Sequence, residues 1–385
     1  MRTSMILLAL VAASPLARAD AKFSDGEKAF QQTKAMLLKE YVDQHLTEDD
    51  LYRAAVAGML AGAGKRQWDV LLSPDEWGEM QETLSGQVVG IGIEVRFEPD
   101  GGLVSVLGVI PGSPSEKAGV QAGDRILKVD GRSLKGLTLR DVVHKIRGPV
   151  SESVALTLLR DDQIISKSVK RAALAWSPVT ELSLPGPIAV IGVKTFNGKT
   201  ASLLRAALER VQAHKPRGLV IDLRGNEGGL FDTLVDCAGL LLPKGKLVVT
   251  KLGRGGEEEA FRAQGEPLAG GVPVLVLTDG TTASSAELFA GALQQSGGAR
   301  VVGKRTHGKW NVQKVVQLPN GWALKYTVGV FKSPRGELLD GKGLEPDLEV
   351  EMDPASVEKT QRLRDPQARL AADPQLRAAV ALLKL

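Results

Sequence analysis

The spacing of apolar residues near the N-terminus predicts helices. Between residues 25 and 80 apolar side chains recur at helical intervals, as at Ala55 and Met59. The run Ser73-Pro74-Asp75-Glu76 predicts a helix start, because serine caps helices and proline fits their first turn. We expect residues 20–85 to form a small helical module with no chemistry of its own.

The pattern changes between Gly86 and Arg171 to short β-rich runs separated by turn residues. This alternation predicts a compact β-rich domain over residues 86–171 with two short helices. The strands are expected at residues 88–95, 103–109, 125–129, 154–159 and 164–169, and the helices after Pro114 and at residues 139–146.

Strands and helices alternate again from residue 187 to residue 350, which predicts an α/β core within residues 172–353. The tail, residues 354–385, is expected to be helical and shows no site. The core strands are expected at residues 188–193, 218–223, 247–250, 272–277, 301–303, 315–317 and 323–328, and the core helices at residues 199–212, 230–241 and 286–295.

The first nineteen residues have the pattern of an export signal. Arg2 precedes an apolar run of about nine residues, and Ala17-Arg18-Ala19 is a small-x-small cleavage site. The run is too short to span a bilayer, so we expect no transmembrane segment in the mature chain. The alternative is an uncleaved anchor or a frayed N-terminus. We expect export, most consistent with a bacterial periplasm, and cleavage near Ala19.

Composition excludes several classes of protein. With 43% hydrophobic and 24% charged residues, the 385-residue chain is neither disordered nor collagen-like. The formal net charge of +4 is too small to argue for nucleic acid. One cysteine, Cys237, cannot make an intramolecular disulfide or a zinc site.

Cofactor motifs are also missing from the sequence. The glycines of residues 253–256 lack the Lys-Ser/Thr pair of a phosphate-binding loop, and no His-Glu-x-x-His motif occurs. We therefore expect no metal and no organic cofactor. The acidic run Glu257-Glu258-Glu259 is expected to be a solvated loop.

Candidate chemistry begins where the apolar strand expected at residues 272–277 runs through small hydroxyl residues into a helix. This arrangement places Ser284 at a helix N-terminus, where unpaired N–H groups favour developing negative charge. Taken alone, the junction favours a serine that only caps a helix, because serine and threonine are preferred caps. Ser285 competes with Ser284 by adjacency.

A candidate base follows Ser284 by 25 positions, at Lys309. A serine hydroxyl attacks a carbonyl only when a base removes its proton, and a neutral lysine can be that base. Burial lowers the pKa of a lysine toward the working range. The two residues together predict nucleophilic catalysis.

Ser284, Lys309 and Gln313 with their flanking residues resemble the carboxyl-terminal processing peptidases, serine proteases with a Ser–Lys dyad and a nearby glutamine. The resemblance covers nearly the whole chain after the export segment, because residues 218–230 and 341–347 also match in order. It implies a crotonase- or ClpP-like α/β core of mixed sheet and helices, with an inserted β-rich PDZ domain and an N-terminal helical module.

The resemblance also implies roles for individual residues. Ser284 would be the nucleophile and Lys309 the general base, later the acid. Gln313 would orient Lys309, either from one face of a helical turn or through a bend. The backbone N–H of Ser285, with that of Gly228 or Gly229, would form the oxyanion hole.

The segment Gly90-Ile91-Gly92-Ile93 looks like the peptide-binding stretch of a bacterial PDZ domain, together with residues 113–126 and 129–131. Such a segment offers N–H donors to a terminal carboxylate and a strand edge to a peptide. Ile91, Ile93, Val142 and Ile146 would line the pocket for an apolar terminal side chain. The alternative is a rigid spacer.

The sequence therefore predicts an exported serine endopeptidase that binds accessible C-terminal tails of partly unfolded or tagged proteins and cleaves within them. Domain order suggests that bound peptide gates the site, which deletion of residues 86–171 would test. An activating adaptor protein and homo-oligomers are left open.

Three rival interpretations remain. The first is a catalytically silent PDZ-containing scaffold, suggested by Trp310 at a position where the family has a small residue. The second is an acyl-binding enzyme of the crotonase type. The third is a Ser–His–Asp site of Ser284 and His307 with Asp222 or Asp279.

Overall fold

The computed structural model describes residues 25–64, 68–86, 88–98, 103–174, 177–184, 187–363 and 365–383. The predicted export segment, residues 1–19, lies outside them and stays a prediction. Within the described ranges, no helix is both long enough and apolar enough to cross a membrane. The chain divides into two compact units, residues 1–66 and 67–385.

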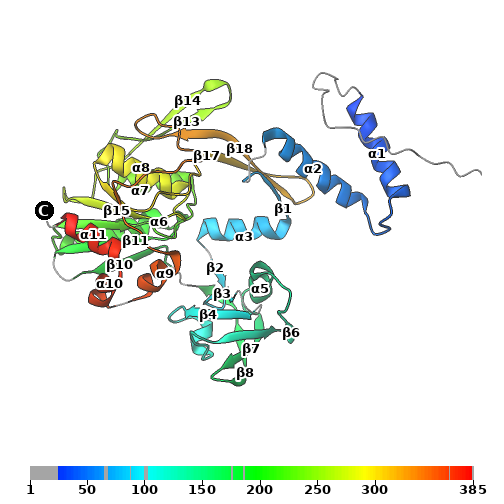
Figure 1. The fold of residues 1–385 in the computed structure, drawn as a ribbon, viewed down its shortest axis with the longest axis horizontal. Coiled ribbons are helices and arrows are strands. Elements are labelled where there is room, and N and C mark those ends of the chain that lie inside the picture. The colour runs from blue at the N-terminus through cyan, green and yellow to red at the C-terminus, as the bar shows by residue number, and fades with distance from the viewer. Residues whose placement is uncertain are drawn as a thin grey trace, which may run out of the picture. The chain divides into compact units, whose positions relative to one another are not determined.

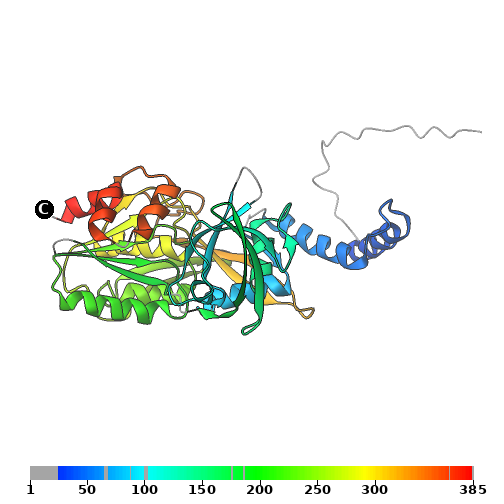
Figure 2. The same cartoon turned by 90° about the horizontal axis from the view of Figure 1, so that it is seen from below.

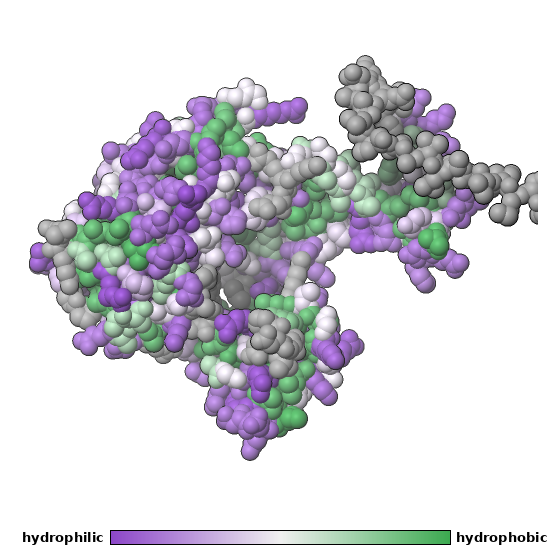
Figure 3. All heavy atoms as spheres, in the orientation of Figure 1, coloured by the Kyte–Doolittle hydropathy of each residue, from purple (hydrophilic) through white to green (hydrophobic). Residues whose placement is uncertain are grey.

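The N-terminal unit contains two helices, α1 (Gly26–Glu40) and α2 (Glu48–Gly64), so the helical prediction is confirmed here (Figure 1). No residue of either helix is buried. Large apolar side chains such as Met36 and Met59 are exposed, and hydrophobic residues are visible on the surface of this unit (Figure 3).

The second unit is built on a six-stranded sheet whose pairs are all parallel except the first. Its central strands are continuous apolar runs, as is typical of parallel strands buried on both faces. The short edge strands β10 and β19 were not predicted. The strand order is β10 (Val179–Ser183), β11 (Ile188–Val193), β12 (Gly218–Asp222), β15 (Val274–Thr278), β16 (Arg300–Gly303) and β19 (Leu348–Glu349).

Helices cover both faces of this sheet, which confirms the α/β core (Figure 2). On β12, Leu219 and Ile221 face one layer while Val220 faces the other, because strand side chains alternate. The first layer contains α6 (Thr200–Ala213), α7 (Phe231–Gly239) and α8 (Ser285–Gly297). The second contains the tail helices α9 (Pro354–Arg362), α10 (Pro366–Ala372) and α11 (Pro374–Leu383).

A second sheet is made of β1 (Val70–Leu72), β18 (Ala323–Lys332), β13 (Leu247–Gly253), β14 (Glu258–Arg262) and β17 (Asn311–Gln317). The loop prediction for Glu257-Glu258-Glu259 was wrong for Glu258 and Glu259, because they lie on β14, which pairs with β13 in a hairpin. Glu257 precedes the strand. The side chains of this run are exposed, so an acidic composition does not prevent an edge strand. Gln313 lies on β17 rather than on a helical turn.

The inserted domain contains five main strands, β3 (Ile93–Glu98), β4 (Leu103–Val109), β5 (Arg125–Val129), β7 (Ser153–Arg160) and β8 (Gln163–Lys170), with the short β6 (Arg132–Ser133) beside β5. Its helices are α4 (Pro114–Lys117) and α5 (Leu139–Ile146). The predicted strand over residues 88–95 is divided at Gly92, whose φ is 83°. Its first part, β2 (Val88–Gly90), pairs with β9 (Ala172–Leu174) in a separate sheet.

The helix predicted to start at Ser73 is confirmed as α3 (Pro74–Ser85). The Ser73 side chain accepts a hydrogen bond from the Glu76 N–H, and the Glu76 carboxylate accepts one from the Ser73 N–H. This reciprocal capping satisfies two N–H groups that a helix leaves unpaired.

A buried ionic network joins the tail to the core, although the sequence shows no role for the tail. The Arg224 guanidinium is fully buried and donates to Asp222 at 2.8 Å and to Asp373 at 2.7 Å. Burial opposes ionisation of Asp222, but Arg224 outweighs it and holds the pKa of that carboxyl well below its usual range. The buried guanidinium is therefore paired with one carboxylate from the core and one from the tail.

Replacing Asp373 with alanine is expected to lower the free energy of unfolding by about 3–5 kcal/mol, because it leaves part of a buried cation unpaired. Urea unfolding followed by circular dichroism measures this change. The control is Glu351→Ala, which removes the exposed partner of Lys304 and is expected to change stability far less. Equal losses in the two variants would contradict the structural role of the tail.

Candidate active site

The turn after β15 holds Ser284 in a strained conformation. Ser284 is the N-cap residue of α8, with φ 53° and ψ −124°. A non-glycine residue in such a sparsely populated region costs about 1–3 kcal/mol, and such strain is found where a side chain must be aimed. The side chain of Ser284 stands, partly exposed, at the N-terminus of a buried helix.

Hydrogen bonds fix the loop that leads to Ser284. The Asp279 carboxylate accepts the N–H groups of Thr281 and Thr282, at 3.0 and 2.9 Å. The Ala283 N–H donates to the Asn226 carbonyl at 2.9 Å. The loop is thereby tied to the segment that follows β12, which carries the glycines of the predicted oxyanion hole.

The hydroxyl of Ser285, the rival nucleophile, is already used in a hydrogen bond. Its side chain is buried, and its hydroxyl donates to the Gly229 carbonyl at 2.9 Å. A hydroxyl already bonded in the interior is poorly placed to attack a substrate. The geometry therefore favours Ser284 over Ser285.

The two predicted glycines differ in what their N–H groups do. The Gly228 N–H donates to the Asn226 side chain at 2.8 Å, so it is occupied. Within the part of the chain that the structure describes, the N–H groups of Gly229 and Ser285 have no acceptor. A Cβ on Gly228 would lie 2.8 Å from Ser284 Cβ, so only glycine fits there. The available donors beside Ser284 are therefore Gly229 and Ser285.

Lys309 lies on the loop between β16 and β17 with its amine partly buried. The Nζ atom lies over the ring of Trp68, 4.4 Å from the ring centroid. Burial and the nearby positive charge of Lys325 lower the pKa of Lys309 to about 8, while Glu227 and Glu287 act in the opposite direction. A lysine with this pKa is partly neutral near neutral pH, as a general base must be.

Gln313 does not contact Lys309 in this structure. Its side-chain amide donates to the backbone carbonyl of Trp68 at 2.8 Å. Lys309 and Gln313 thus converge on the same tryptophan, on the ring and on the carbonyl respectively. Trp68 was not identified from the sequence, because no local pattern connects it with residues about 240 positions away.

Glu287 is another site residue that the sequence analysis missed. Its carboxylate is fully buried and accepts five hydrogen bonds, which come from the turn that carries Ser284 and from the loop that carries Lys309. A signal existed, since Glu287 is the one charged residue in an otherwise apolar stretch of α8. The donors are the N–H groups of Ser284 (2.9 Å), Gly308 (2.7 Å) and Lys309 (2.7 Å), the Trp310 indole N–H (3.2 Å) and the Thr306 hydroxyl.

Trp310 packs in the core and not in the site. Its ring is fully buried and lies against Gly291 of α8, where an added Cβ would come within 2.9 Å of the ring. Its indole N–H is one of the donors to Glu287. The bulky residue beside Lys309 therefore supports the loop that carries the lysine.

The Ser–His–Asp alternative is not assembled. His307 is exposed and lies edge-on to Trp68, with 5.4 Å between ring centroids. Asp222 is paired with Arg224, and Asp279 accepts hydrogen bonds from its own loop. Among the described residues there is also no cluster of three or more His, Cys, Asp or Glu side chains that could hold a metal ion.

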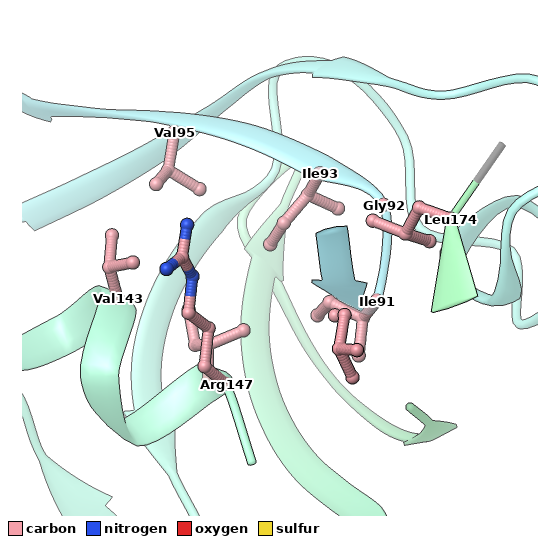
Figure 4. A pocket seen from close by; sticks show the side chains of 10 residues that line it. Ile91, Gly92, Ile93, Val95, Val143, Arg147 and Leu174 are labelled. Atoms are coloured by element: carbon pink, nitrogen blue, oxygen red, sulfur yellow. The ribbon is translucent and has the colours of Figure 1, made fainter. Parts of the chain in front are cut away.

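The inserted domain carries a second candidate site, a groove of about 240 Å³ between α5 and the segment from Val89 to Val95 (Figure 4). β3 is an edge strand of its sheet, so its outer side is open to an added strand. Five of the six predicted residues line the groove, namely Gly90, Ile91, Gly92, Ile93 and Ile146.

Val142, the sixth predicted residue, lies instead in the core of the inserted domain with no exposed surface. Val143 and Arg147 line the groove beside Ile146. Neighbouring positions are about 100° apart around a helix, so Val142 points to the core while Val143, Ile146 and Arg147 share the groove face of α5.

Comparisons with known proteins agree with this architecture. A profile described as "Peptidase family S41" matches residues 187–350, and a "PDZ domain" profile matches residues 105–160. The carboxyl-terminal-processing protease of Synechocystis is 31% identical over 354 residues, which cover 90% of this chain and 82% of that protein. A CtpA-like serine protease of Staphylococcus aureus is 34% identical over 309 residues, 79% of this chain and 61% of the staphylococcal one.

Solved structures agree as well. The photosystem II D1 C-terminal processing protease is 28% identical with a TM-score of 0.55, covering 91% of this chain and 92% of that one. An S41 protease structure from Bacteroides fragilis, at 18% identity and a TM-score of 0.58, covers 92% of this chain and 97% of its own and shows the likeness of fold alone.

Glu287→Gln is expected to lower the free energy of unfolding by about 2–6 kcal/mol. The amide nitrogen replaces one acceptor oxygen, so at least two buried donors lose their partner at about 1–3 kcal/mol each. Hydrogen–deuterium exchange at the amides of Ser284, Gly308 and Lys309 is expected to rise. The exposed Glu345→Gln is the control, and unchanged exchange in Glu287→Gln would rule out the linking role.

Proposed function

This chain belongs to peptidase family S41 as a carboxyl-terminal-processing serine protease, and we propose that it binds C-terminal tails through its PDZ domain and cleaves them with a Ser284–Lys309 dyad. The observation that carries the proposal is the convergence of both segments on the Glu287 carboxylate. The buried Glu287 carboxylate thus sets the position of the turn that carries Ser284 relative to the loop that carries Lys309.

In the proposed reaction, neutral Lys309 takes the proton of the Ser284 hydroxyl as the oxygen attacks the scissile carbonyl. The negative oxygen that develops is held by the N–H groups of Gly229 and Ser285. The protonated lysine then gives its proton to the leaving amine, which leaves the acyl group bound to Ser284. In the second half of the reaction neutral Lys309 takes a proton from water, and the water attacks the acyl group and releases it. Losing one oxyanion donor would cost roughly 100- to 1000-fold in rate.

Trp68 determines what must move before this reaction can start. The Lys309 amine rests on the Trp68 ring, and the Gln313 amide is bonded to the Trp68 carbonyl. In the proposed working state the amine leaves the ring and bonds to Ser284, and Gln313 turns to orient it. An incoming substrate chain that displaces the Trp68 side chain would permit both changes.

The PDZ groove supplies the specificity in this proposal. The open edge of β3 can take a tail as an added strand, and apolar side chains of the groove can accept an apolar last residue. The same domain as a rigid spacer would need neither an open edge nor an apolar groove. The interpretation as a catalytically silent scaffold was suggested by Trp310 beside Lys309. Because the Trp310 ring lies in the core, this residue no longer supports that interpretation.

Ser284→Ala and Lys309→Ala are each expected to reduce cleavage of an unfolded protein by at least about 1000-fold, since each removes one half of the dyad. Ser285→Ala is expected to retain detectable cleavage, because only its bonded hydroxyl is lost. The exposed Ser202→Ala is the matched control. Cleavage is measured by mass spectrometry of the products.

Residual activity of Ser284→Ala equal to the wild type would refute the dyad. Complete inactivity of the folded wild-type chain, with every activating partner supplied, would favour the scaffold interpretation instead.

The pH profile tests the neutral lysine. Since the pKa of Lys309 is lowered to about 8, kcat/KM is expected to rise with pH and to level off above pH 8. Lys325→Gln removes a positive charge that lowers this pKa, so the rising limb should move to higher pH. Glu227→Gln removes a negative charge that raises it, so the limb should move to lower pH. Shifts in the same direction would show that another group limits the rate.

A further inference from the structure

The segment that carries the oxyanion glycines also carries a negative charge. Glu227 lies between Asn226 and Gly228, after the end of β12, and its side chain is exposed. Within the described residues, the Glu227 carboxylate makes neither an ion pair nor a hydrogen bond. The proposed reaction does not use this side chain, and an exposed side chain adds nothing to the core. Its charge is therefore free to act on a substrate.

The backbone around Glu227 is held in place. The side-chain amide of Asn226 donates to the Val193 carbonyl at 2.9 Å, and its side-chain oxygen accepts the Gly228 N–H at 2.8 Å. The Gly228 carbonyl in turn accepts the Phe196 N–H at 2.9 Å. A fixed piece of backbone thus carries the carboxylate, although the side chain itself reaches into solvent.

This piece of backbone lies against the proposed nucleophile. A Cβ on Gly228 would come within 2.8 Å of Ser284 Cβ and 3.0 Å of the Ser285 nitrogen, so the two segments are in contact. Consecutive Cα atoms are about 3.8 Å apart, so Glu227 is one residue away from this contact. A substrate whose carbonyl enters the oxyanion hole must therefore pass near the Glu227 carboxylate.

Lys309 indicates on which side of the scissile bond the Glu227 charge acts. Burial and Lys325 lower the pKa of Lys309, and the negative charge of Glu227 acts in the opposite direction. The Lys309 amine is therefore close enough to feel that charge. In the proposed reaction this amine gives its proton to the leaving amine, so it must reach the first residue of the leaving fragment. Glu227 acts on the same side.

Among the described residues, no other charge beside the site cancels that of Glu227. Lys325 comes from β18 of the second sheet and does not lie within ion-pair distance of Glu227. The Lys309 amine rests on the Trp68 ring, and its surroundings favour the neutral form. The exposed carboxylate is therefore the charge that the leaving fragment of a substrate would meet.

We propose that Glu227 makes the site prefer substrates with Lys or Arg at the first or second residue of the leaving fragment, and disfavour Asp or Glu there. The inference rests on the proposed function, in which Ser284 and Lys309 cleave protein tails. Side chains alternate along an extended chain, so one of these two positions faces Glu227. Because the charge is exposed, the preference is graded and sensitive to salt.

Peptide cleavage by the full chain tests the proposal. A peptide from an unfolded protein, with one cleavage site mapped by mass spectrometry, is resynthesised with Lys, Gln or Glu at the first or second residue after the cut. At one position the Lys peptide is expected to have a kcat/KM about 2- to 5-fold above that of the Gln peptide, and the Glu peptide one lower by a similar factor. The differences should shrink in about 0.5 M salt, which screens exposed charges.

Variants at Glu227 then locate the discrimination. Glu227→Gln is expected to abolish the differences between the peptides, and Glu227→Lys to reverse their order. Each comparison is a ratio of two peptides on one variant, so a changed pKa of Lys309 cancels. Glu266→Lys makes the same charge change at an exposed glutamate on the loop after β14 and should retain the wild-type order. Thermal unfolding of each variant confirms that it is folded.

The outcomes separate this inference from the function on which it rests. Equal or reversed kcat/KM values for the Lys, Gln and Glu peptides on the wild-type chain overturn the inference, while cleavage by the dyad stands. A preference that survives in Glu227→Gln, or that appears only when the exchange is made before the scissile bond, assigns the selectivity to another residue and also overturns it. Absence of cleavage for every peptide, or full cleavage by Ser284→Ala, overturns both.

Discussion

One buried carboxylate, that of Glu287, is the interaction on which the proposed active site depends. It accepts hydrogen bonds from two backbone N–H groups of the loop that carries Lys309 and from the N–H of Ser284. The Thr306 hydroxyl and the Trp310 indole, which belong to the same loop as Lys309, donate the other two. A charge in the interior is tolerated only when it is so paired. The satisfied carboxylate therefore fixes two segments of the chain in one geometry.

Several features of the site follow from that link. The positive φ of Ser284 is unfavourable by itself, and the hydrogen bond from its N–H to Glu287 helps to offset the cost. The loop that bonds to Glu287 also places the Lys309 side chain beside Trp68, where burial lowers the pKa of the amine. Packing of the Trp310 ring against Gly291 holds the other side of the loop. Structural and chemical roles are thus shared by the same few contacts.

The surroundings of Lys309 adjust the chemistry of the proposed dyad. They favour the neutral amine, which suits a group that must accept a proton. Burial, which removes part of the water around the amine, is the largest cause of the lowered pKa.

Local patterns in the sequence determined most of the fold and the candidate dyad. Apolar runs and helical spacing predicted the central core strands and helices but not the edge strands β10, β14 and β19. The strand–serine–helix junction, a lysine 25 positions later and the family resemblance together pointed to Ser284 and Lys309. Only the tertiary structure decided the rest. Which face of α5 meets the groove, that the Gly228 N–H is occupied, and that Gln313 meets Trp68, 245 residues away, depend on contacts between distant segments. Such contacts produce no periodic pattern in the local sequence, because they depend on how whole helices and strands pack against one another.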